Sequence, residues 1–536
     1  MARDFDAEHA PRRSNPTIAD LRAMTLVERG WLGESDRANA FRLAARFSDH
    51  LLHQPGRGWA VWDGRRFDFA KGWERALRTC MRLSDLIEEE AVAIRLHEAT
   101  DQEAEARMWI TRDGVRPRQM THARSLVQKE RAADHRDHAE RCGNTGRIKA
   151  AMELLKALLQ VDASGFDARP SLLNCTNGTL DLEALAAGRR GHEANDGSQP
   201  RTPLRSHDAG DRLTKVARAA WDPTADGEAW ARFLSDVMPD PEMRAFLQRA
   251  LGLAVFGRND QQVALFLRGE GGNGKSTLVN AVAHALGDYA APCRIELLLE
   301  TRTQAAGAPS PEEMNLPGAR LFLCPEPDRS DRLSAKKLKA FTGGDPRPIR
   351  APYGEREFIY TPTGIPVITC NRTPRLATDD HGTRRRMVFI PFEARLDQLP
   401  PGRRRDQRDL EAELKAEAPA ILNWLIEGWL ATRSRGLDAP PDAREQRESF
   451  EALEDPVGEF PAARCVHRPG KRLRKQAVFD AYDRWAAREM APPLPRDAFN
   501  RIMTEKGYVA RKTSGGRLHW EDIAWASDGA EGAPSD

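Results

Sequence analysis

A glycine-rich stretch, residues 269–277, constrains this chain more than any other feature of its sequence. It reads Gly-Glu-Gly-Gly-Asn-Gly-Lys-Ser-Thr and fits the pattern G-x-x-x-x-G-K-[ST]. An apolar run at 263–267 precedes it and a helical pattern at 278–286 follows it, which is the order strand, loop, helix. A chance glycine-rich loop would need neither flanking element. The stretch therefore predicts a site for a nucleoside triphosphate.

Each residue type in this stretch has a chemical reason to be there. Glycines let backbone N–H groups turn inward around a phosphate, and the helix N-terminus adds its partial positive charge. Lys275 is expected to reach the β- and γ-phosphates, and Ser276 to bind Mg²⁺. The expected cofactors are ATP and Mg²⁺. The residues expected to hold the nucleotide are Gly269, Gly271, Gly272, Asn273, Gly274, Lys275, Ser276 and Thr277.

The chain has 536 residues, which suggests roughly three or four domains. Its net charge is only +2, because 82 Lys and Arg nearly balance 80 Asp and Glu. A near-neutral total leaves nucleic acid open as a partner, since local basic patches matter more. No apolar run approaches the ~20 residues of a membrane span, and the N-terminus has no apolar signal core. We expect a soluble, cytoplasmic protein with no membrane partner.

Cysteine and histidine give little support for a structural metal. The seven cysteines include no C-x-x-C pair, which argues against a disulfide framework and against a zinc ribbon. His135, His138 and Cys142 follow one another at i, i+3 and i+7 of a predicted helix, a conceivable metal-binding face. The same segment is rich in Asp, Arg and Glu, so a solvated helix face is the favoured interpretation.

Two strands after the glycine-rich loop end in polar side chains. Residues 318–326 form an apolar run that ends in Glu326, and residues 364–371 form one that ends in Asn371. A carboxylate in the first position orients Mg²⁺ and the attacking water, and an amide in the second senses the γ-phosphate. Glu326 follows Cys324 and Pro325 where many ATPases have two adjacent acids. Glu326 therefore serves both roles, or Asp328 assists it.

Three arginines, residues 384–386, stand directly before the apolar run 387–391. The plain interpretation is a solvated basic turn. The functional interpretation is an arginine finger, which stabilises the charge of the transition state. Arg385 is the first candidate and Arg386 the second. A finger that acts on a neighbouring subunit requires a ring of subunits.

A β-hairpin is predicted between the two polar-ended strands, with strands near 349–351 and 355–360. Arg347, Arg350 and Arg356 lie on it, and Tyr353 lies at its tip. Basic side chains with an aromatic one suit the backbone and bases of single-stranded DNA. A plain surface hairpin is the alternative.

Taken together these motifs resemble superfamily 3 DNA helicases, most closely the D5-like branch of phage and plasmid primase–helicases (P4-type). The motifs that carry the resemblance are Lys275, Glu326, Lys339 with Thr342–Asp345 in L-K-x-x-T-G-G-D, Asn371 with Pro374, and Arg385–Arg386 before Ile390–Phe392. The resemblance extends upstream through residues 172–182, 213–215, 221–223 and 230–234, and downstream through 417–424, 479–485, Phe499 and Gly507–Tyr508.

The resemblance implies a homo-hexameric AAA+ ring that hydrolyses ATP, translocates on single-stranded DNA, usually 3′ to 5′, and unwinds forked DNA during replication. It places Lys339 among the DNA contacts and the protein in the bacterial host of a phage, prophage or plasmid. Only about 45 residues precede the helicase-associated region, and they show no paired-acid pattern. We therefore expect no primase activity in this polypeptide and a separate primase or polymerase as a partner.

The expected fold class is α/β: an AAA+ phosphate-loop core of superfamily 3 type, a mostly helical N-terminal domain and a C-terminal winged-helix unit. A basic linker, residues 467–475, is expected to open that last unit. The expected divisions are a polar tail (1–45), a D5-like N-terminal domain (46–257), the ATPase core (258–395), a helical lobe (396–466), the winged-helix unit (467–525) and a disordered tail (526–536).

Two other functions fit parts of the sequence. An ATP-controlled replication initiator would bind DNA without processive unwinding, and a strand-displacement assay separates it from a helicase. A small-molecule kinase could also use the glycine-rich loop. The kinase would leave Asn371, the arginines at 384–386 and the long C-terminal extension unexplained.

Overall fold

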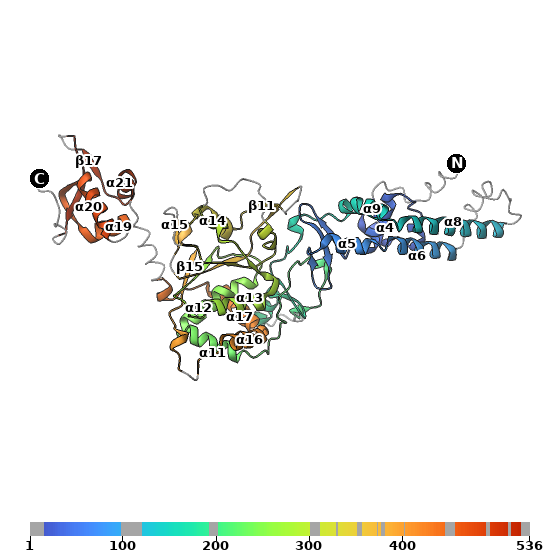
Figure 1. Cartoon of the computed structure of the whole chain (residues 1–536), viewed down its shortest axis with the longest axis horizontal. Helices are drawn as coiled ribbons and strands as arrows, with labels where there is room; N and C mark the ends of the chain where they lie inside the picture. The colour runs from blue at the N-terminus through green and yellow to red at the C-terminus, as the bar shows by residue number, and fades with distance from the viewer. Residues whose placement is uncertain are drawn as a thin grey trace.

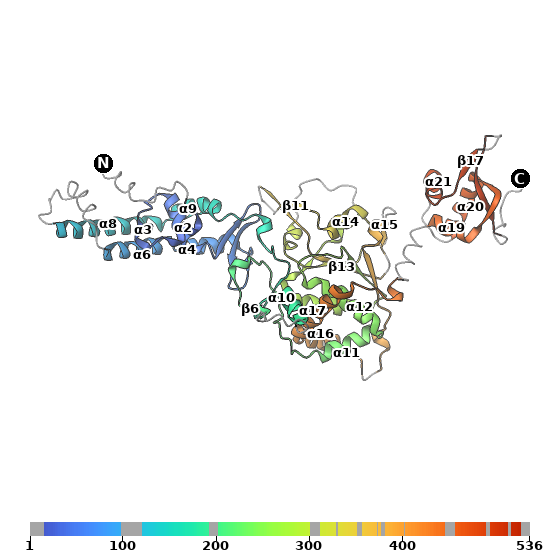
Figure 2. The same cartoon turned by 180° about the vertical axis from the view of Figure 1, so that it is seen from behind.

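The computed structural model describes residues 16–97, 120–191, 202–300, 311–328, 331–350, 356–371, 374–376, 381–400, 403–444, 456–488, 494–512 and 516–526. Figures 1 and 2 show these residues from opposite sides. Within them, no helix combines the length and apolar character needed to cross a membrane.

A five-stranded parallel sheet forms the centre of the molecule. Its strands stand in the order β15-β7-β13-β9-β8, and every neighbouring pair is parallel. The inner strands read as continuous apolar runs because both faces of the sheet are covered. The bounds are β7 (Ala264–Arg268), β8 (Ala290–Pro292), β9 (Leu321–Cys324), β13 (Ile365–Cys370) and β15 (Met387–Pro391). The expected α/β class with a parallel sheet is confirmed.

Two hydrophobic cores cover the two faces of this sheet. The larger core contains side chains of α11 (Glu228–Val237), α12 (Pro241–Gly252), α13 (Lys275–Leu286), α16 (Gln407–Ala416) and α17 (Ala418–Arg435). The smaller core contains side chains of α14 (Ala335–Gly343), β11 (Arg347–Arg350) and β12 (Glu357–Tyr360). In Figure 1 these two groups lie on opposite sides of the sheet. Two short parallel strands, β10 (Arg332–Leu333) and β14 (Arg375–Leu376), pair beside it, and α15 (His381–Arg384) leads into β15.

The N-terminal region is a helical unit with a small antiparallel sheet, and it extends to one side of the central sheet in Figure 1. The strands are β1 (Leu51–Gln54), β2 (Gly58–Trp62) and β3 (Phe67–Asp68), and the turn between β2 and β3 contains Asp63–Gly64. Helices α6 and α8 pack along each other. The helices are α2 (Ile18–Ala23), α3 (Leu26–Gly30), α4 (Asp36–Phe47), α5 (Gly72–Cys80), α6 (Leu83–Leu96), α8 (Met120–Cys142) and α9 (Thr145–Leu158).

A second antiparallel sheet joins this unit to the centre. It contains β4 (Leu172–Cys175), β5 (Gly178–Asp181) and β6 (Leu204–Arg205), and α10 (Leu182–Gly191) follows β5. The Arg320 guanidinium, which is buried just before β9, donates to the carbonyls of Leu172 and Val255 and lies 4.4 Å from the ring centroid of Tyr289. The Tyr289 hydroxyl accepts from the backbone N–H of Asn174 at 3.0 Å. One buried arginine thus links β4 to the sheet.

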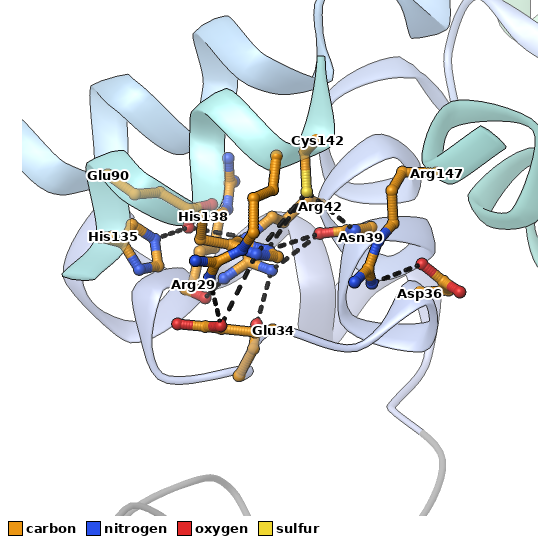
Figure 3. A network of polar contacts seen from close by, with 12 residues as sticks. Arg29, Glu34, Asp36, Asn39, Arg42, Glu90, His135, His138, Cys142 and Arg147 are labelled. Atoms are coloured by element: carbon orange, nitrogen blue, oxygen red, sulfur yellow. Dashed lines mark hydrogen bonds and ion pairs between the residues drawn. The ribbon is translucent and has the colours of Figure 1, made fainter. Parts of the chain in front are cut away.

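His135, His138 and Cys142 do not form a solvated helix face, so that interpretation was wrong. All three are buried where α8 meets α4 and α6, because polar side chains from those helices satisfy them (Figure 3). His135 Nε2 lies 2.9 Å from Glu90 Oε2, and His138 Nε2 lies 3.2 Å from Asn39 Oδ1. Burial lowers the pKa of His138 to about 3, so this side chain is neutral. Within the described ranges, no group of three His, Cys, Asp or Glu side chains could hold a metal ion.

The C-terminal unit begins earlier than the sequence predicted. Residues 467–475 were expected as a basic linker. Instead, strand β16 (Cys465–Arg474) forms there because it pairs with β18 (Leu518–Trp525), which also pairs with β17 (Ala510–Lys512). Helix α19 (Pro456–Arg464), expected in the helical lobe, contributes Val457 and Phe460 to the same core as α20 (Lys475–Arg488) and α21 (Arg496–Glu505). The assignment of this unit to the winged-helix class stays a prediction.

The buried ion pair between Arg42 and Glu90 yields a stability prediction. The Arg42 Nε donates to Glu90 Oε2 at 2.8 Å, and both side chains are almost fully buried. Glu90→Leu should destabilise the N-terminal unit by roughly 3 kcal/mol, because it leaves the Arg42 charge buried and unpaired. The double variant Arg42→Met/Glu90→Leu should recover most of that loss. Denaturant unfolding followed by circular dichroism measures both. Equal destabilisation by the single and double variants would contradict the prediction.

Candidate functional site

The parallel sheet brings the predicted nucleotide residues to one edge. The glycine-rich loop follows β7, Asn371 follows β13 and Glu326 lies two residues beyond β9. In the order β7-β13-β9, Cys370 stands beside Arg268 and Ile368 beside Cys324. Carboxyl ends of parallel strands meet at the same edge, where α/β proteins bind their ligands. The three sequence-predicted elements therefore converge.

The loop itself has a geometry that only glycine permits at two key points. Gly274 has φ +82°, and a Cβ there would lie 2.4 Å from Val237 Cγ1 of α11. A Cβ at Gly269 would lie 2.2 Å from the Phe392 carbonyl oxygen. Helix α13 starts directly after this turn, so its free N–H groups and N-terminal partial charge face the loop. This is the geometry of an anion cradle.

Lys275 and Asn273 fix the inside of the cradle. The Lys275 ammonium is buried and donates to the Glu270 carbonyl at 3.0 Å, to Asn273 Oδ1 at 2.9 Å and to the Gly269 carbonyl. Asn273 Nδ2 donates to the Phe392 carbonyl at 2.7 Å, which ties the loop to the end of β15. Burial lowers the pKa of Lys275, and the nearby Glu326 carboxylate opposes that shift. The loop thus holds a buried cation at the start of α13.

Glu326 and Asn371 contact each other directly. The Asn371 backbone N–H donates to Glu326 Oε1 at 2.6 Å, and Asn371 Nδ2 donates to Glu326 Oε2 at 3.1 Å. Both side chains are exposed at the open edge of the sheet. Asp328 is not brought to the site: its N–H donates to Asp331 Oδ2 at 2.9 Å in a separate turn. The acid and the amide thus form one polar unit beside the loop.

A cavity of about 740 Å³ opens over these groups. Gly271–Thr277, Glu326 and Asn371 form one wall. A second wall comes from three parts of the chain: α11, the loop that follows β15, and α16. From α11 come Ala229, Arg232, Phe233 and Asp236, and from the loop come Leu396, Asp397, Leu399, Arg403, Arg404 and Arg405. Helix α16 adds Gln407, Leu410 and Glu413. The volume suits a ligand of nucleotide size. Gly269 instead lines a neighbouring cavity on the other side of the loop.

Sequence reasoning missed this second wall. Arg232, Phe233 and Asp236 belong to an amphipathic helix whose pattern predicts only a helix. The run of three arginines at 403–405 was a usable signal, because it follows the last strand of the core. An ion pair between Arg403 and Asp236 now closes the wall.

The arginine turn lies at the other edge of the sheet. Met387, the first residue of β15, stands beside Ala264, the first residue of β7, so Arg385 is near the start of β7 and the loop is at its end. Five residues of strand separate them, on the order of 15 Å. Arg385 is exposed and makes no hydrogen bond or ion pair within the described ranges. Arg386 donates to the Lys339 carbonyl at 3.1 Å and to Thr342 Oγ1 at 3.0 Å.

The predicted hairpin is present as β11 and β12, with Arg350 beside Glu357 in the antiparallel register. Ile349 and Phe358 point into the smaller core, so the alternating side chains face outward. Arg356 is exposed and Arg350 is half-buried. The remaining predicted contacts differ. Arg347 lies 3.5 Å from Glu313 Oε2 and Lys339 is half-buried on α14, whereas Tyr353 lies outside the described residues.

Comparisons with known proteins agree with the resemblance. Residues 40–239 match the family model described as D5 N terminal like. Among curated proteins, one named "Putative helicase" from Acanthamoeba polyphaga mimivirus is 38% identical over 160 residues, 30% of this chain and 16% of that protein. One from Frog virus 3, named "Putative helicase 022R", is 24% identical over 269 residues, covering 48% and 27%. A "Putative primase" of African swine fever virus is 26% identical over 339 residues, covering 60% and 33%.

The chain thus spans a third or less of each of these relatives. Among solved structures, the NrS-1 C terminal region superposes with a TM-score of 0.37 at 10% identity, over 61% of this chain and 82% of that one. The resemblance to the D5-like primase–helicase family is confirmed, and residues 40–239 form its D5 N terminal-like part. The relatives come from viruses, and the bacterial host stays a prediction.

Two glycines of the loop provide a matched test of the cradle. Gly274→Ala should weaken nucleotide binding by about tenfold or more, because it strains a positive φ and collides with Val237. Gly271→Ala should have little effect, since a Cβ there meets nothing within 4 Å. Titration of a fluorescent ATP analogue with Mg²⁺ measures both affinities. Equal affinities for the two variants would show that the loop does not bind the phosphates.

Proposed function

We propose that this chain is an ATP-driven DNA helicase of superfamily 3, with a phosphate-loop core of AAA+ type. The observation that carries the proposal is the division of the sheet into two edges. Lys275, Glu326 and Asn371 meet at the carboxyl edge, and Arg385 lies at the amino edge. The D5 N terminal-like match and the helicase and primase names of the relatives support the same class.

The proposed chemistry is hydrolysis of the γ-phosphate of ATP. The Lys275 ammonium neutralises phosphate charge inside the cradle, and the backbone N–H groups of the loop orient the triphosphate. Glu326 accepts a proton from the attacking water, and Asn371 holds that carboxylate in place through its two hydrogen bonds. The exposed Ser276 hydroxyl and the Glu326 carboxylate are oxygen ligands of the kind that Mg²⁺ prefers, and they would hold it. Mg²⁺ supplies charge neutralisation at the phosphates.

The proposed active unit is a ring of six copies of this chain. Arg385 cannot serve the nucleotide of its own chain, because about 15 Å of sheet lies between them. In a ring, Arg385 can instead reach the nucleotide bound to the neighbouring chain. Arg386 donates hydrogen bonds to the Lys339 carbonyl and Thr342 Oγ1 of its own chain. Because its guanidinium already has these partners, Arg385 is the better candidate for the finger.

The proposed DNA contacts lie on the hairpin formed by β11 and β12. Arg350 and Arg356 are available on its strands, and Tyr353 completes the set by sequence. Lys339 and Arg347 stand at its root, where they also support the fold. The proposed substrates are single-stranded and forked DNA, and a separate primase or polymerase is the proposed partner in replication.

Glu326→Gln tests the function as a whole. The amide cannot accept a proton from water, so ATP hydrolysis should fall by at least about a hundredfold while ATP binding is retained. Displacement of the labelled strand from a forked DNA should stop with it. Asp328→Asn is the matched control, because Asp328 lies outside the cavity, and it should hydrolyse ATP normally. Normal hydrolysis by Glu326→Gln would refute the role of Glu326. ATP hydrolysis without strand displacement by the wild-type protein would favour the initiator.

The finger yields a mixing test. Arg385→Ala and Lys275→Ala should each hydrolyse ATP poorly in a uniform ring. A mixed ring should regain activity, because some interfaces then pair an intact Lys275 with a neighbour's intact Arg385. If Arg385 acted on the nucleotide of its own chain, every subunit of the mixture would lack either Lys275 or Arg385, and mixing would restore no activity. A flat mixing curve, with assembly confirmed by size-exclusion chromatography, would therefore contradict the finger in trans.

A further inference from the structure

A second cavity, of about 590 Å³, lies between the N-terminal unit and the central sheet, at the root of the β11–β12 hairpin. Its lining includes the end of β1 with the turn that follows, the segment after α9, and strand β12, and also residues near β9 (Gly257, Pro317, Gly318 and Arg320) and beside the hairpin (Pro346, Thr361 and Thr363). It is separate from the nucleotide cavity, with which it shares no lining residue. None of the sequence motifs accounts for it.

The turn between β1 and β2 fits closely against the hairpin. Gly56 has φ +79°, and a Cβ there would lie 3.1 Å from the carbonyl oxygens of both Arg356 and Glu357. The N-terminal unit therefore touches the backbone of the strand that is proposed to contact DNA. A nucleotide in this cavity would be close to a strand held on Arg350 and Arg356.

Gln54, on this turn, has a polar atom without a partner. Its side chain is 2% exposed and lines the cavity, and its Oε1 accepts no hydrogen bond from any described residue. A buried carbonyl oxygen without a donor is costly, and such atoms are rare in native structures. The cavity thus offers a ready acceptor for a donor on a ligand.

Arg57 supplies the complementary donors three residues further on. Its guanidinium carbon lies 3.7 Å from the ring centroid of Phe69, and it lines the cavity. Burial lowers its pKa to about 10, against the attraction of Asp167 and Asp68. Its backbone N–H donates to the Gln54 carbonyl at 3.1 Å, but its guanidinium forms no hydrogen bond or ion pair with the described residues. The guanidinium N–H groups therefore remain for an acceptor.

The charges on the wall select the kind of ligand. Asp162, Asp167 and Glu357 line the cavity and would repel a phosphate inside it. A nucleobase is neutral and planar and carries both donors and acceptors on one edge. Cytosine fits best, because its amino group can donate to Gln54 Oε1 while its ring nitrogen and carbonyl accept from Arg57. Phe166 and Phe358 provide apolar wall for the ring.

We propose that this cavity binds a nucleobase of the DNA single strand, with preference for cytosine, between the N-terminal unit and the hairpin. The inference rests on the proposed function in one respect, namely that the protein engages single-stranded DNA. It adds a base-reading site and gives the N-terminal unit a part in DNA binding. A free cytidine nucleotide presents the same chemistry, and the test separates the two sources.

The test uses the full-length chain and two fluorescein-labelled twelve-nucleotide strands, oligo(dC) and oligo(dT). Gln54→Leu should weaken oligo(dC) binding by about five- to tenfold in fluorescence anisotropy, the loss of one buried hydrogen bond. Oligo(dT) binding should change less. The unfolding temperature should not fall, because leucine replaces an unpaired buried amide. Gln261→Leu, at an exposed position outside the cavity, is the matched control. Arg57→Gln should give the same loss of preference if Gln54→Leu folds poorly.

Two further arms separate the sources and the hypotheses. The first arm measures the unfolding temperature with millimolar dCMP. If dCMP raises it in the wild type but not in Gln54→Leu, while Gln54→Leu binds oligo(dC) as tightly as the wild type, the ligand is a free nucleotide. The second arm uses Arg350→Ala, which changes the hairpin alone. If Arg350→Ala binds oligo(dC) normally while Gln54→Leu binds it weakly, the hairpin takes no part in DNA binding and the cavity does. Unchanged oligo(dC) affinity, an unchanged ratio to oligo(dT) and no effect of dCMP would overturn the inference.

Discussion

The parallel pairing of β7 with β13 and β15 decides which polar side chains meet at each edge of the central sheet. Because β7 and β13 run the same way, the glycine-rich loop and Asn371 leave the sheet at one edge, and β9 adds Glu326 there. Because β15 also runs the same way, the arginine turn enters the sheet at the opposite edge. If one of these strands ran the other way, its polar residue would lie at the opposite edge of the sheet, away from the others of its set. The register therefore determines which polar side chains can share one ligand.

Polar contacts tie the segment before the glycine-rich loop to the sheet and to the helical lobe. Arg320 binds the carbonyls of Leu172 and Val255, and Glu417, at the start of α17, accepts from the N–H groups of Ala229 and Trp230 in α11. Hydrogen bonds to charged groups are stronger than neutral ones, and losing one partner would leave a buried charge unsatisfied. The D5 N terminal-like segment is thus fixed to the sheet and the helical lobe alike. Its last helix, α11, can then form a wall of the cavity over the glycine-rich loop.

The sequence predicted those parts whose residue types are dictated by local chemistry. The strand, loop and helix around Lys275, the acid strand, the amide strand and the hairpin are all present at the expected places. It failed where tertiary pairing overrides composition: residues 465–474 look like a basic linker until β18 pairs with them. His138 looked solvent-facing for the same reason, since only the packing of α8 against α4 brings Asn39 to it. The run Arg403–Arg405 was a signal in the sequence, but only the folded chain shows that it lies against α11 and lines the same cavity.

A short chain of contacts joins the arginine turn, at the amino edge of the sheet, to the β11–β12 hairpin. Arg386 follows Arg385 directly and holds Lys339 and Thr342 at the end of α14. Only Gly344–Pro346 then separate this helix end from β11. Any displacement of the Arg385–Arg386 turn would therefore be transmitted to the root of the hairpin through these two hydrogen bonds, without passing through the sheet. The turn of Gly56 would resist or follow that movement, since it lies against the backbone of Arg356 and Glu357. In this arrangement the N-terminal unit is mechanically part of the hairpin, although some 300 residues separate Gly56 and Glu357 in sequence.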